Sequence, residues 1–356
     1  MLRIIAAAAL LAVSACAAPP SPSSATPVSA PAATGDWNAA ALAEAVAYVQ
    51  SQKTTGFLII QDRKVIAEHN WPLPDDAASQ TFRANFVHGE AAGGALREDV
   101  ASQQKSLIAF LIGVGVDKGL IDIGKPVSSY IGAGWTKAAP EQEAAITIRH
   151  LLEMTSGLKE DLTYEAPAGQ KFFYNTPAYA KLKPVLEKAS GQPLYLVSQL
   201  WFTKIADMHS TGWEQRPGAF GDVGNPTGLV TTPHDLAIMG QIVLDRGCKP
   251  NGARIISEAQ LDAIFKPTAT NPAYGQLWWL NNGAYSFAPG TGAPRREGAL
   301  IASAPRDLLA AQGAQDRKLF VVPSMNLIVV RTGQAAPDRA FNDKLWTLIM
   351  KAAPTH

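Results

Sequence analysis

Apolar and polar positions form short β-type runs near both ends of the chain, whereas longer apolar segments fill its middle. Residues 56–61 and 64–69 are β-rich and flank Asp62-Arg63, a spacing that predicts a tight hairpin. Four more short β-rich runs occur late in the chain, each bounded by Gly, Pro, Asn or Asp. These later runs span residues 274–280, 308–314, 318–322 and 327–331.

The middle of the chain shows helical patterns, several with recognisable caps. Residues 107–116 are apolar or glycine and precede Asp117-Lys118-Gly119, which predicts a buried helix that ends at a glycine. Between residues 119 and 252 we expect mostly helices, with strand character only near 172–174. The other expected helices are 36–50 capped by Asp36, one that starts at Thr147, 177–189 before Gly191, Thr232 to Gly247, Ser257 to 265, and 338–352.

This order of elements predicts an α+β fold. Its antiparallel sheet would be assembled from both ends of the chain, flanked by N- and C-terminal helices, with a helical lobe inserted between the two halves. We expect the sheet lobe at about residues 36–105 and 255–356, and the helical lobe at about 106–254. The cleft between the lobes is the expected site for a ligand.

Composition narrows the classes of partner. The chain has 356 residues, of which 47% are hydrophobic, enough for a large core. Its 31 basic and 30 acidic residues leave a net charge of +1, so the sequence carries no signature of nucleic-acid binding. The six histidines show no metal-ligand spacing, and we expect neither a metal nor another cofactor.

The N-terminus has the features of an export signal. Arg3 precedes an apolar stretch at residues 4–13, which is too short to span a bilayer comfortably. The following Val13-Ser14-Ala15-Cys16 resembles the bacterial lipobox, in which the cysteine is lipidated and becomes the first residue of the mature protein. An ordinary cleaved signal is the alternative. With Cys16 lipidated, the second cysteine, Cys248, is expected to form no disulfide.

Residues 17–35, rich in Ala, Pro and Ser, are expected to be a flexible tether between the lipid anchor and a folded domain at 36–356. Ala17, rather than an aspartate, follows Cys16, and by analogy with lipoproteins this favours the outer membrane. The sequence thus predicts an exported protein, anchored by lipid in the bacterial envelope and facing the periplasm.

Ser102 and Lys105 stand three residues apart at the start of the buried helix. Residues at this spacing share a helix face, so the amine lies within reach of the hydroxyl. A lysine among apolar neighbours loses proton affinity and can remove the proton of a nucleophilic serine. The N–H groups of a helix start can stabilise the oxyanion formed when a serine attacks a carbonyl. A second Ser-x-x-Lys, at Ser156 and Lys159, shows that the motif alone is weak, and that copy follows a helix end.

Two further segments complete a candidate site. Tyr174 could exchange protons with the serine and leaving group, and a nearby lysine ammonium would lower the pKa of its phenol. A tyrosine that serves only the core is the alternative. The small-residue segment Ala311-Gln312-Gly313-Ala314 would let a substrate approach a strand closely, although an ordinary glycine bulge would look the same.

The order of these segments resembles the serine β-lactamase-like superfamily. It is most similar to the branch with class C β-lactamases, family VIII esterases, 6-aminohexanoate-dimer hydrolases and D,D-peptidases. The resemblance extends over nearly the whole mature chain, and residues 146–158 are its most specific part. It implies Ser102 as acylated nucleophile, Lys105 as its base and Tyr174 as the tyrosine of the Tyr-x-Asn element. Ser102 and Ala314 would supply the oxyanion hole through their backbone N–H groups.

The resemblance also implies that Thr176, Ala311, Gln312 and Gly313 contact the substrate. Ala311 and Gln312 replace the lysine and threonine of the family's Lys-Thr-Gly triplet, which weakens recognition of a substrate carboxylate. We therefore expect small esters or amides as substrates, with cell-wall peptides as a further class and weak β-lactamase activity. Arg317 could restore the missing charge. A β-lactamase, a D,D-peptidase and a catalytically silent penicillin-binding-like lipoprotein are the alternatives. The oligomeric state is not predictable.

Overall fold

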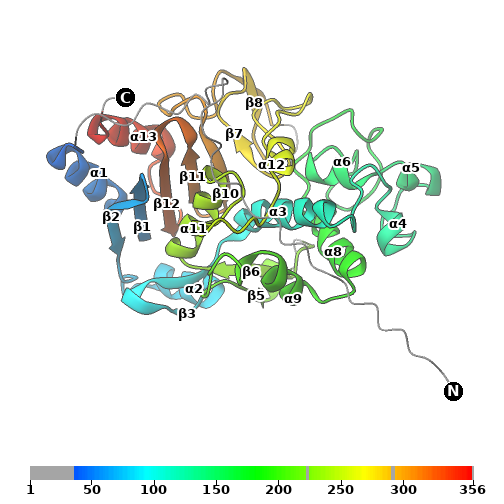
Figure 1. Ribbon diagram of the computed structural model, residues 1–356, viewed down its shortest axis with the longest axis horizontal. Coiled ribbons are helices and arrows are strands. Elements are labelled where there is room, and N and C mark those ends of the chain that lie inside the picture. The colour runs from blue at the N-terminus through cyan, green and yellow to red at the C-terminus, as the bar shows by residue number, and fades with distance from the viewer. Residues whose placement is uncertain (1–35, 222–223, 290–292, 355–356) are drawn as a thin grey trace.

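The computed structural model describes residues 36–221, 224–289 and 293–354. Its central element is a six-stranded sheet in which every neighbouring pair of strands is antiparallel (Figure 1). Both ends of the chain build this sheet, which confirms the predicted α+β class. In order across the sheet, the strands are β2 (Lys64–Asn70), β1 (Thr54–Gln61), β12 (Leu327–Gly333), β11 (Arg317–Val322), β10 (Leu309–Gly313) and β7 (Trp279–Leu280).

The predicted hairpin is present between β1 and β2. Asp62 and Arg63 form its turn with φ angles of 49° and 62°, which match a two-residue turn whose twist suits the paired strands. Asn326, in the loop before β12, donates a hydrogen bond to the Asp62 carboxylate over 2.8 Å. This contact joins the N-terminal hairpin to the C-terminal strands.

Helices cover both faces of the large sheet. On one face, Phe320 of β11 meets Trp346 of α13 (Phe341–Ala352) edge to face, with ring centroids 5.5 Å apart, and α13 lies against α1 (Ala39–Ser51). On the opposite face, α11 (Pro233–Leu244) lies against β1, β11 and β12. Adjacent residues of β11 point to opposite faces, so one strand contacts both helical layers.

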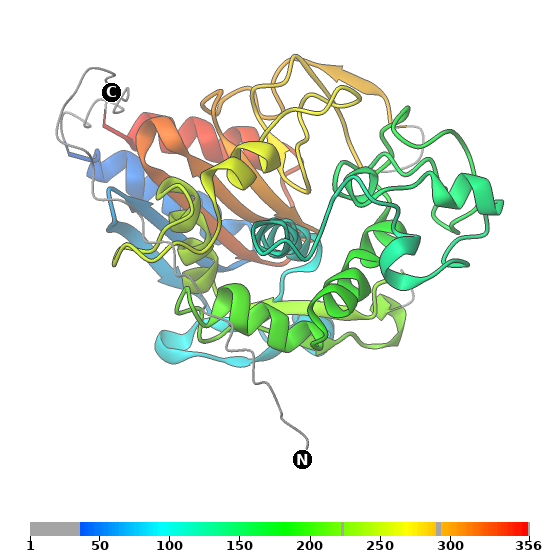
Figure 2. The ribbon, with the colours of Figure 1, turned by 45° about the vertical axis from the view of Figure 1, so that its right-hand side comes forward.

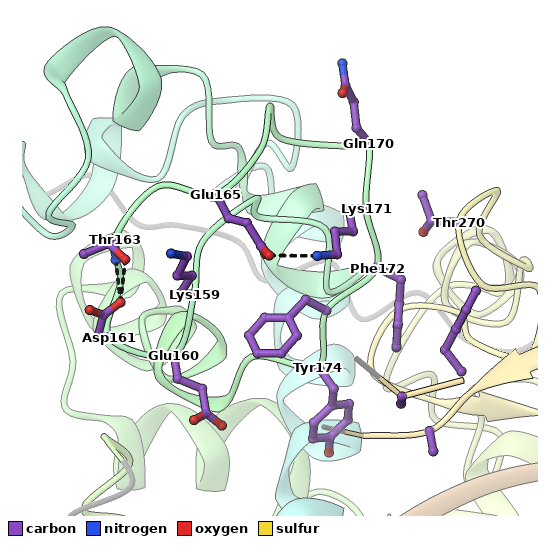
Figure 3. Close-up of a pocket in the computed structure, with 14 residues that line it drawn as sticks. Lys159, Glu160, Asp161, Thr163, Glu165, Gln170, Lys171, Phe172, Tyr174 and Thr270 are labelled. Atoms are coloured by element: carbon purple, nitrogen blue, oxygen red, sulfur yellow. Dashed lines mark hydrogen bonds and ion pairs between the residues drawn. The ribbon is translucent and has the colours of Figure 1, made fainter. Parts of the chain in front are cut away.

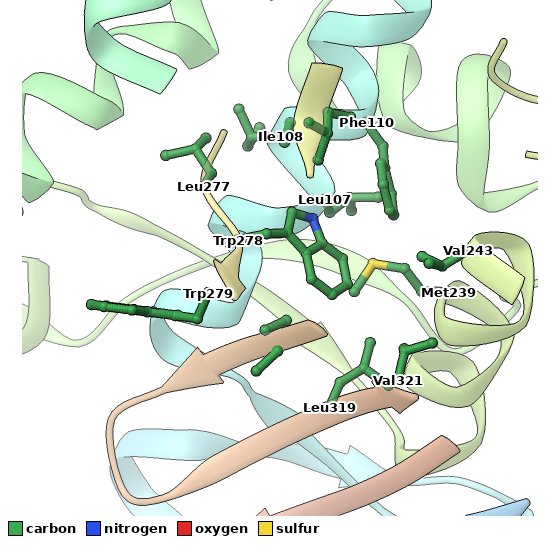
Figure 4. Packing of buried hydrophobic residues seen from close by; sticks show 14 of the residues in the cluster. Leu107, Ile108, Phe110, Met239, Val243, Leu277, Trp278, Trp279, Leu319 and Val321 are labelled. Atoms are coloured by element: carbon green, nitrogen blue, oxygen red, sulfur yellow. The ribbon is translucent and has the colours of Figure 1, made fainter. Parts of the chain in front are cut away.

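Helix α3 (Gln104–Asp117) runs through the middle of the molecule and is seen almost end-on in Figure 2. Trp278 packs beside it and donates a hydrogen bond from Nε1 to the carbonyl of Ser106 over 3.3 Å. Leu107, Met239 and Val321 surround the same indole ring (Figure 4). The core therefore fixes the helix that follows the candidate nucleophile.

Most predicted helix caps are confirmed. Thr147, Thr232 and Ser257 each accept a hydrogen bond from the backbone of the helix that they precede. The remaining helices are α2 (Ala77–Phe86), α4 (Ser128–Ile131), α5 (Pro140–Ala144), α6 (Ile148–Leu152), α7 (Thr176–Ala180), α8 (Leu182–Ser190), α9 (Leu194–Ser198), α10 (Gly218–Gly221) and α12 (Glu258–Ile264), with short turns of other helix types at Ala92–Gly94, Ala101–Gln103, Gln199–Thr203 and Pro323–Met325.

A second antiparallel sheet of four strands was not predicted. Two strands lie between the predicted hairpin and Ser102, where no strand was expected, and two lie in the region expected to be mostly helical. In order across the sheet they are β3 (Val87–Glu90), β4 (Leu96–Asp99), β6 (Thr227–Thr231) and β5 (Gly212–Gln215). Strands of four or five residues are too short to show a clear alternation of apolar and polar positions. A two-stranded sheet joins β8 (Tyr285–Phe287) and β9 (Arg295–Glu297).

Four expectations about single elements are corrected. Asn38, not Asp36, caps the first helix, and its Oδ1 accepts from the N–H of Ala41 over 2.9 Å. The helix expected at 177–189 is two helices, α7 and α8, which are separated at Lys181. Only the last two residues of the run at 274–280 pair as a strand, because the left-handed Leu277 (φ 60°) interrupts it. Residues 172–174 are not a strand.

The described residues contain no helix long and apolar enough to cross a membrane. Cys248 is disulfide-bonded, so the expectation that it forms no disulfide is wrong. The predicted signal peptide, Cys16 and the tether lie outside the described residues, and the lobe boundaries stay a prediction.

Candidate active site

Ser102 lies in a short 3₁₀ turn, Ala101–Gln103, that joins β4 to α3. Ser102 was expected in the first turn of the buried α-helix, but it lies in the turn directly before that helix. Ala101, directly before the serine, has a φ of 50°, a conformation that is uncommon for residues other than glycine. The carboxylate of Asp99 holds this conformation by accepting from the N–H of Ala101 over 2.8 Å.

Arg216, which follows β5, pairs with this carboxylate through two hydrogen bonds of 2.7 and 2.9 Å. The two side chains are only 4% and 1% exposed, so the pair is desolvated. Glycine at position 228 is required here, because a Cβ atom would lie 2.0 Å from Asp99 Oδ2. The nucleophile turn is thus braced from behind by a buried ion pair.

Lys105 is brought to Ser102 as predicted, with its Nζ 3.0 Å from the serine Oγ. The lysine is 1% exposed, and its amine faces the rings of Tyr174 and Tyr179 at 4.9 and 4.7 Å from their centroids. Burial, together with the positive charge of Arg216, lowers the pKa of Lys105 to about 7. A large fraction of this amine is therefore neutral at neutral pH and can accept the serine proton.

Tyr174 is also at the site, where its ring faces the Lys105 amine and its phenol is close enough to Ser102 for the serine to lower its pKa. Burial raises the pKa of Tyr174 to about 12, an effect that Ser102 only partly offsets. The expectation of a lowered pKa is therefore wrong, because desolvation of the phenol outweighs any attraction to the neighbouring amine. Tyr174 keeps its proton and can pass it on, rather than act as an anionic base.

The backbone around Ser102 offers two N–H groups to an oxyanion. Within the described part of the chain, neither the N–H of Ser102 nor that of Ala314 has a hydrogen-bond partner. Strand β10 lies directly against the nucleophile turn: a Cβ atom at Gly313 would be 2.3 Å from the carbonyl of Val100. Gln103 further ties the turn to the strand by donating to the carbonyl of Ala311 over 3.2 Å.

A cleft of about 730 Å³ opens over the serine. Residues from the nucleophile turn, two loops and the end of β10 line it: Ala101, Ser102, Lys105, Glu160, Asp161, Leu162, Thr176, Pro177, Arg216, Gly224, Asn225 and Ala314. A second cavity of about 760 Å³ adjoins it and shares Glu160 and Asp161. Figure 3 shows Tyr174 and Phe172 on the wall of this second cavity.

The predicted substrate-binding residues separate into two groups. Thr176 lines the cleft, as does Ala314. Ala311 and Gly313 are used instead in packing β10 against the nucleophile turn, and the Gln312 side chain accepts a hydrogen bond from Lys318 over 2.8 Å. Contact of the triplet with substrate stays a prediction.

Arg317 does not restore a charge to the cleft. Its side chain is 0% exposed and lies 3.4 Å from the carboxylate of Glu98, and it donates to the carbonyl of Ala314 over 2.9 Å. Its role here is to hold the turn after β10. Burial lowers the pKa of Arg317, whereas the negative charge of Glu98 raises it.

The second Ser-x-x-Lys copy has no such surroundings. Ser156 is buried after the end of α6, and its Oγ accepts from the N–H of Leu158 over 3.3 Å. Lys159 is exposed. Between Tyr174 and Thr176, Asn175 is also structural: its amide donates to the carbonyls of Leu158 and Lys159 over 2.9 Å each. It thereby fixes the loop that carries Glu160 and Asp161 into the cleft.

Sequence reasoning missed four residues of the site: Asp99, Arg216, Lys183 and Asn225. Lys183 of α8 is 7% exposed, and Asn225, which lines the cleft, is 1% exposed. The sequence signal for them is slight, because Asp99 and Arg216, and likewise Lys183 and Asn225, are far apart in the sequence. Among the described residues, no group of three or more His, Cys, Asp or Glu could hold a metal ion.

Comparison with known proteins shows what this chain is similar to. The family model for Beta-lactamase matches residues 41–353. The 6-aminohexanoate-dimer hydrolase of Paenarthrobacter ureafaciens is 24% identical over 285 residues, which cover 67% of each chain. The structure of a putative β-lactamase from Bacteroides dorei has a TM-score of 0.66 and 13% identity, covering 89% of this chain and 99% of the other. EstCE1, a hydrolase with promiscuous acyltransferase activity, gives 0.61 and 16%, covering 89% and 99%. The chain belongs to the Beta-lactamase family.

Proposed function

We propose that the protein is a serine hydrolase that forms an acyl-enzyme on Ser102 and then transfers the acyl group to water. The observation that carries the proposal is the 3.0 Å contact between Ser102 Oγ and Lys105 Nζ. Burial lowers the pKa of this amine to about 7. Hydrolases among the relatives and structural neighbours of the chain support the same class of reaction.

In the proposed reaction, neutral Lys105 takes the proton of Ser102 while Oγ attacks the substrate carbonyl carbon. The N–H groups of Ser102 and Ala314 stabilise the negative charge that develops on the carbonyl oxygen. The C–O or C–N bond then breaks, and the leaving group receives a proton from the Tyr174 hydroxyl, which Lys105 replenishes. In the second half, a water molecule attacks the acyl carbon and gives a proton to Lys105. The bond to Ser102 Oγ then breaks, Oγ takes back a proton from the Lys105 and Tyr174 pair, and the acid is released.

The experiment that tests this proposal is covalent labelling with a fluorophosphonate, followed by intact mass and peptide mapping. We expect one label on Ser102, and none in the Ser102→Ala variant. Ser156→Ala is the matched control, because it alters the serine of the second Ser-x-x-Lys copy, and it should label like the unchanged protein. Labelling that persists in Ser102→Ala, or complete absence of labelling and turnover in the unchanged protein, would sink the mechanism.

We further propose small neutral esters or amides as substrates, rather than β-lactams with a free carboxylate. Arg216 is the cation of the cleft whose charge is permanent, and Asp99 already neutralises it. The exposed Glu160 and Asp161 add negative charge at the rim. A charge-assisted contact is worth about 1.5–3 kcal/mol, so its loss would reduce discrimination for a carboxylate by roughly tenfold or more. Catalytic efficiency on a short-chain p-nitrophenyl ester should exceed that on a chromogenic cephalosporin, and the reverse order would refute this preference.

For location, we propose lipid anchoring at Cys16 in the outer membrane, facing the periplasm. The sequence around Cys16 supports this proposal, and fatty-acid labelling tests it. The Cys16→Ser variant should lose the label and its partition into detergent. A sulfur that carries lipid cannot also form a disulfide, so the mass of the mature N-terminal peptide under non-reducing conditions separates the two states. A membrane-bound Cys16→Ser variant would argue for an uncleaved signal instead.

A further inference from the structure

Asn225 and Lys183 form a buried polar pair at one wall of the cleft. Asn225 lines the cleft with Ser102, Thr176 and Ala314. Lys183 lies on α8, where it is buried together with Leu182 and Val185. A lysine amine in such surroundings is unfavourable unless it makes several hydrogen bonds. The reason for a lysine at this position must therefore lie in what its amine contacts.

The amine of Lys183 contacts three oxygen atoms. It is hydrogen-bonded to Oδ1 of Asn225, to the carbonyl of Thr227 at 2.7 Å and to the Thr227 hydroxyl at 2.9 Å. Its charge, when present, also faces the Trp213 ring at 4.8 Å. A neutral amine still has two N–H groups, enough for Asn225 Oδ1 and the Thr227 carbonyl, so the contact with Asn225 does not depend on the protonation of Lys183.

This contact determines how the Asn225 amide is oriented. In the structure Lys183 donates to the carbonyl oxygen of the Asn225 amide, which leaves the NH₂ group as the other end of the amide. Asn225 is held at a second point by Arg216, whose Nη1 donates to the Asn225 backbone carbonyl over 3.2 Å. The side chain therefore cannot exchange its oxygen and nitrogen without losing the hydrogen bond from Lys183.

The NH₂ group of Asn225 has no hydrogen-bond partner among the described residues. Among the described residues that line the cleft, Asn225 alone has a buried side-chain donor without a hydrogen-bond partner. Buried donors are normally paired, and an unpaired one beside a cleft suggests that a ligand supplies the acceptor. The preorganised donor would then favour a bound group with an oxygen atom at this point.

We propose that Asn225 donates a hydrogen bond to an oxygen acceptor in the acyl part of the substrate, and that Lys183 is the positioning residue that keeps the donor in place. The inference rests on the proposed acyl transfer to Ser102. It narrows the substrate class to acyl groups with an amide or ester carbonyl close to the scissile bond, in preference to plain alkanoyl groups.

Two p-nitrophenyl esters with acyl chains of equal length test the proposal. N-Acetylglycinate has an amide carbonyl in its acyl chain, whereas pentanoate has only methylene groups. The measured quantity is the ratio of their kcat/KM values, because intrinsic reactivity of the esters and general damage to the fold cancel when the ratio is compared between variants. We expect Asn225→Asp, which keeps the shape and the Lys183 contact but has no donor, to lower the ratio by about tenfold.

Lys183→Met should lower the ratio by a similar factor, since it retains the apolar stem but releases the Asn225 amide. Lys188→Met, an exposed lysine on the same helix, is the matched control and should retain the ratio of the unchanged protein. A retained ratio in Asn225→Asp overturns the proposal even if Lys183→Met fails to fold. If pentanoate hydrolysis itself does not depend on Ser102, the proposed function fails as well, so the two failures are distinguishable.

Discussion

Replacing Arg216 with methionine should shift the pH dependence of Ser102 acylation to higher pH. In the unchanged protein the rate should rise with pH as Lys105 loses its proton, with a midpoint near its pKa of about 7. Arg216 contributes to that low value through its positive charge. Its removal also leaves the Asp99 carboxylate without its partner. Both changes stabilise the ammonium form of Lys105, so both raise its pKa.

The size of the effect follows from the neutral fraction of the amine. Nearby charges shift pKa values by about one to three units in proteins. A rise of about one unit lowers the neutral fraction at pH 7 from about one half to about one tenth, and each further unit lowers it about tenfold more. At a pH well above the new midpoint the rates should converge, because Lys105 is neutral in both proteins. The predicted loss is therefore large at pH 6–7 and small at alkaline pH.

The assay is the rate of fluorophosphonate labelling, measured by intact mass between pH 5 and 9. Arg216→Lys is the control because it keeps a positive charge while losing the two-point contact with Asp99. Breaking a buried ion pair costs about 3–5 kcal/mol, so both variants must first be shown to be folded at the assay temperature. The reasoning is refuted if Arg216→Met is folded and its midpoint equals that of the unchanged protein. It is equally refuted if the Lys and Met variants shift by the same amount.

Two further predictions follow from the same site. Tyr174→Phe should lower the rates of both acylation and deacylation by about 100-fold or more at unchanged thermal stability, because it removes a proton donor beside Ser102. Wild-type turnover of this variant in stopped-flow and steady-state assays would mean that Lys105 acts alone. Gly228→Ala should destabilise the fold and reduce labelling of Ser102, because the added Cβ atom would lie 2.0 Å from Asp99 Oδ2. Gly212→Ala is the control and should do neither, because no atom lies within 4 Å of its added Cβ. Equal urea midpoints of unfolding for the two variants would contradict this argument.

The sequence predicted the large sheet because its strands are bounded by turn residues and the hairpin turn is only two residues long. It also predicted the caps at Thr147, Thr232 and Ser257, where a short polar side chain directly precedes an apolar helix. The four-stranded sheet was missed, since its strands are too short to show a clear alternation, and β4 and β6, which join its two halves, are far apart in the sequence. Register and partners of such strands are decided by tertiary packing.

The proximity of Ser102 and Lys105 was predictable because both are in one turn of chain, where spacing fixes distance. The pKa of Tyr174 was not, since the expectation considered one neighbouring charge and omitted desolvation. The same limit applies to Arg216: it is 117 residues away from Asp99 in the chain, and nothing local to either residue reveals the pairing. Charged residues that stabilise a site through buried contacts are thus the class that sequence reasoning found least well.

The buried charges around Ser102 explain why Lys105 can be neutral, and thus act as a base, at neutral pH. Arg216 lowers the pKa values of both Lys105 and Lys183, and Lys105 also lowers that of Lys183, whereas Asp99 raises it. A guanidinium does not lose its proton, so Arg216 takes the carboxylate. The two amines have no such partner, and burial with repulsion from the remaining cations lowers their pKa values to about 7 and about 6. The ion pair that braces the nucleophile turn is therefore the same feature that favours a neutral Lys105.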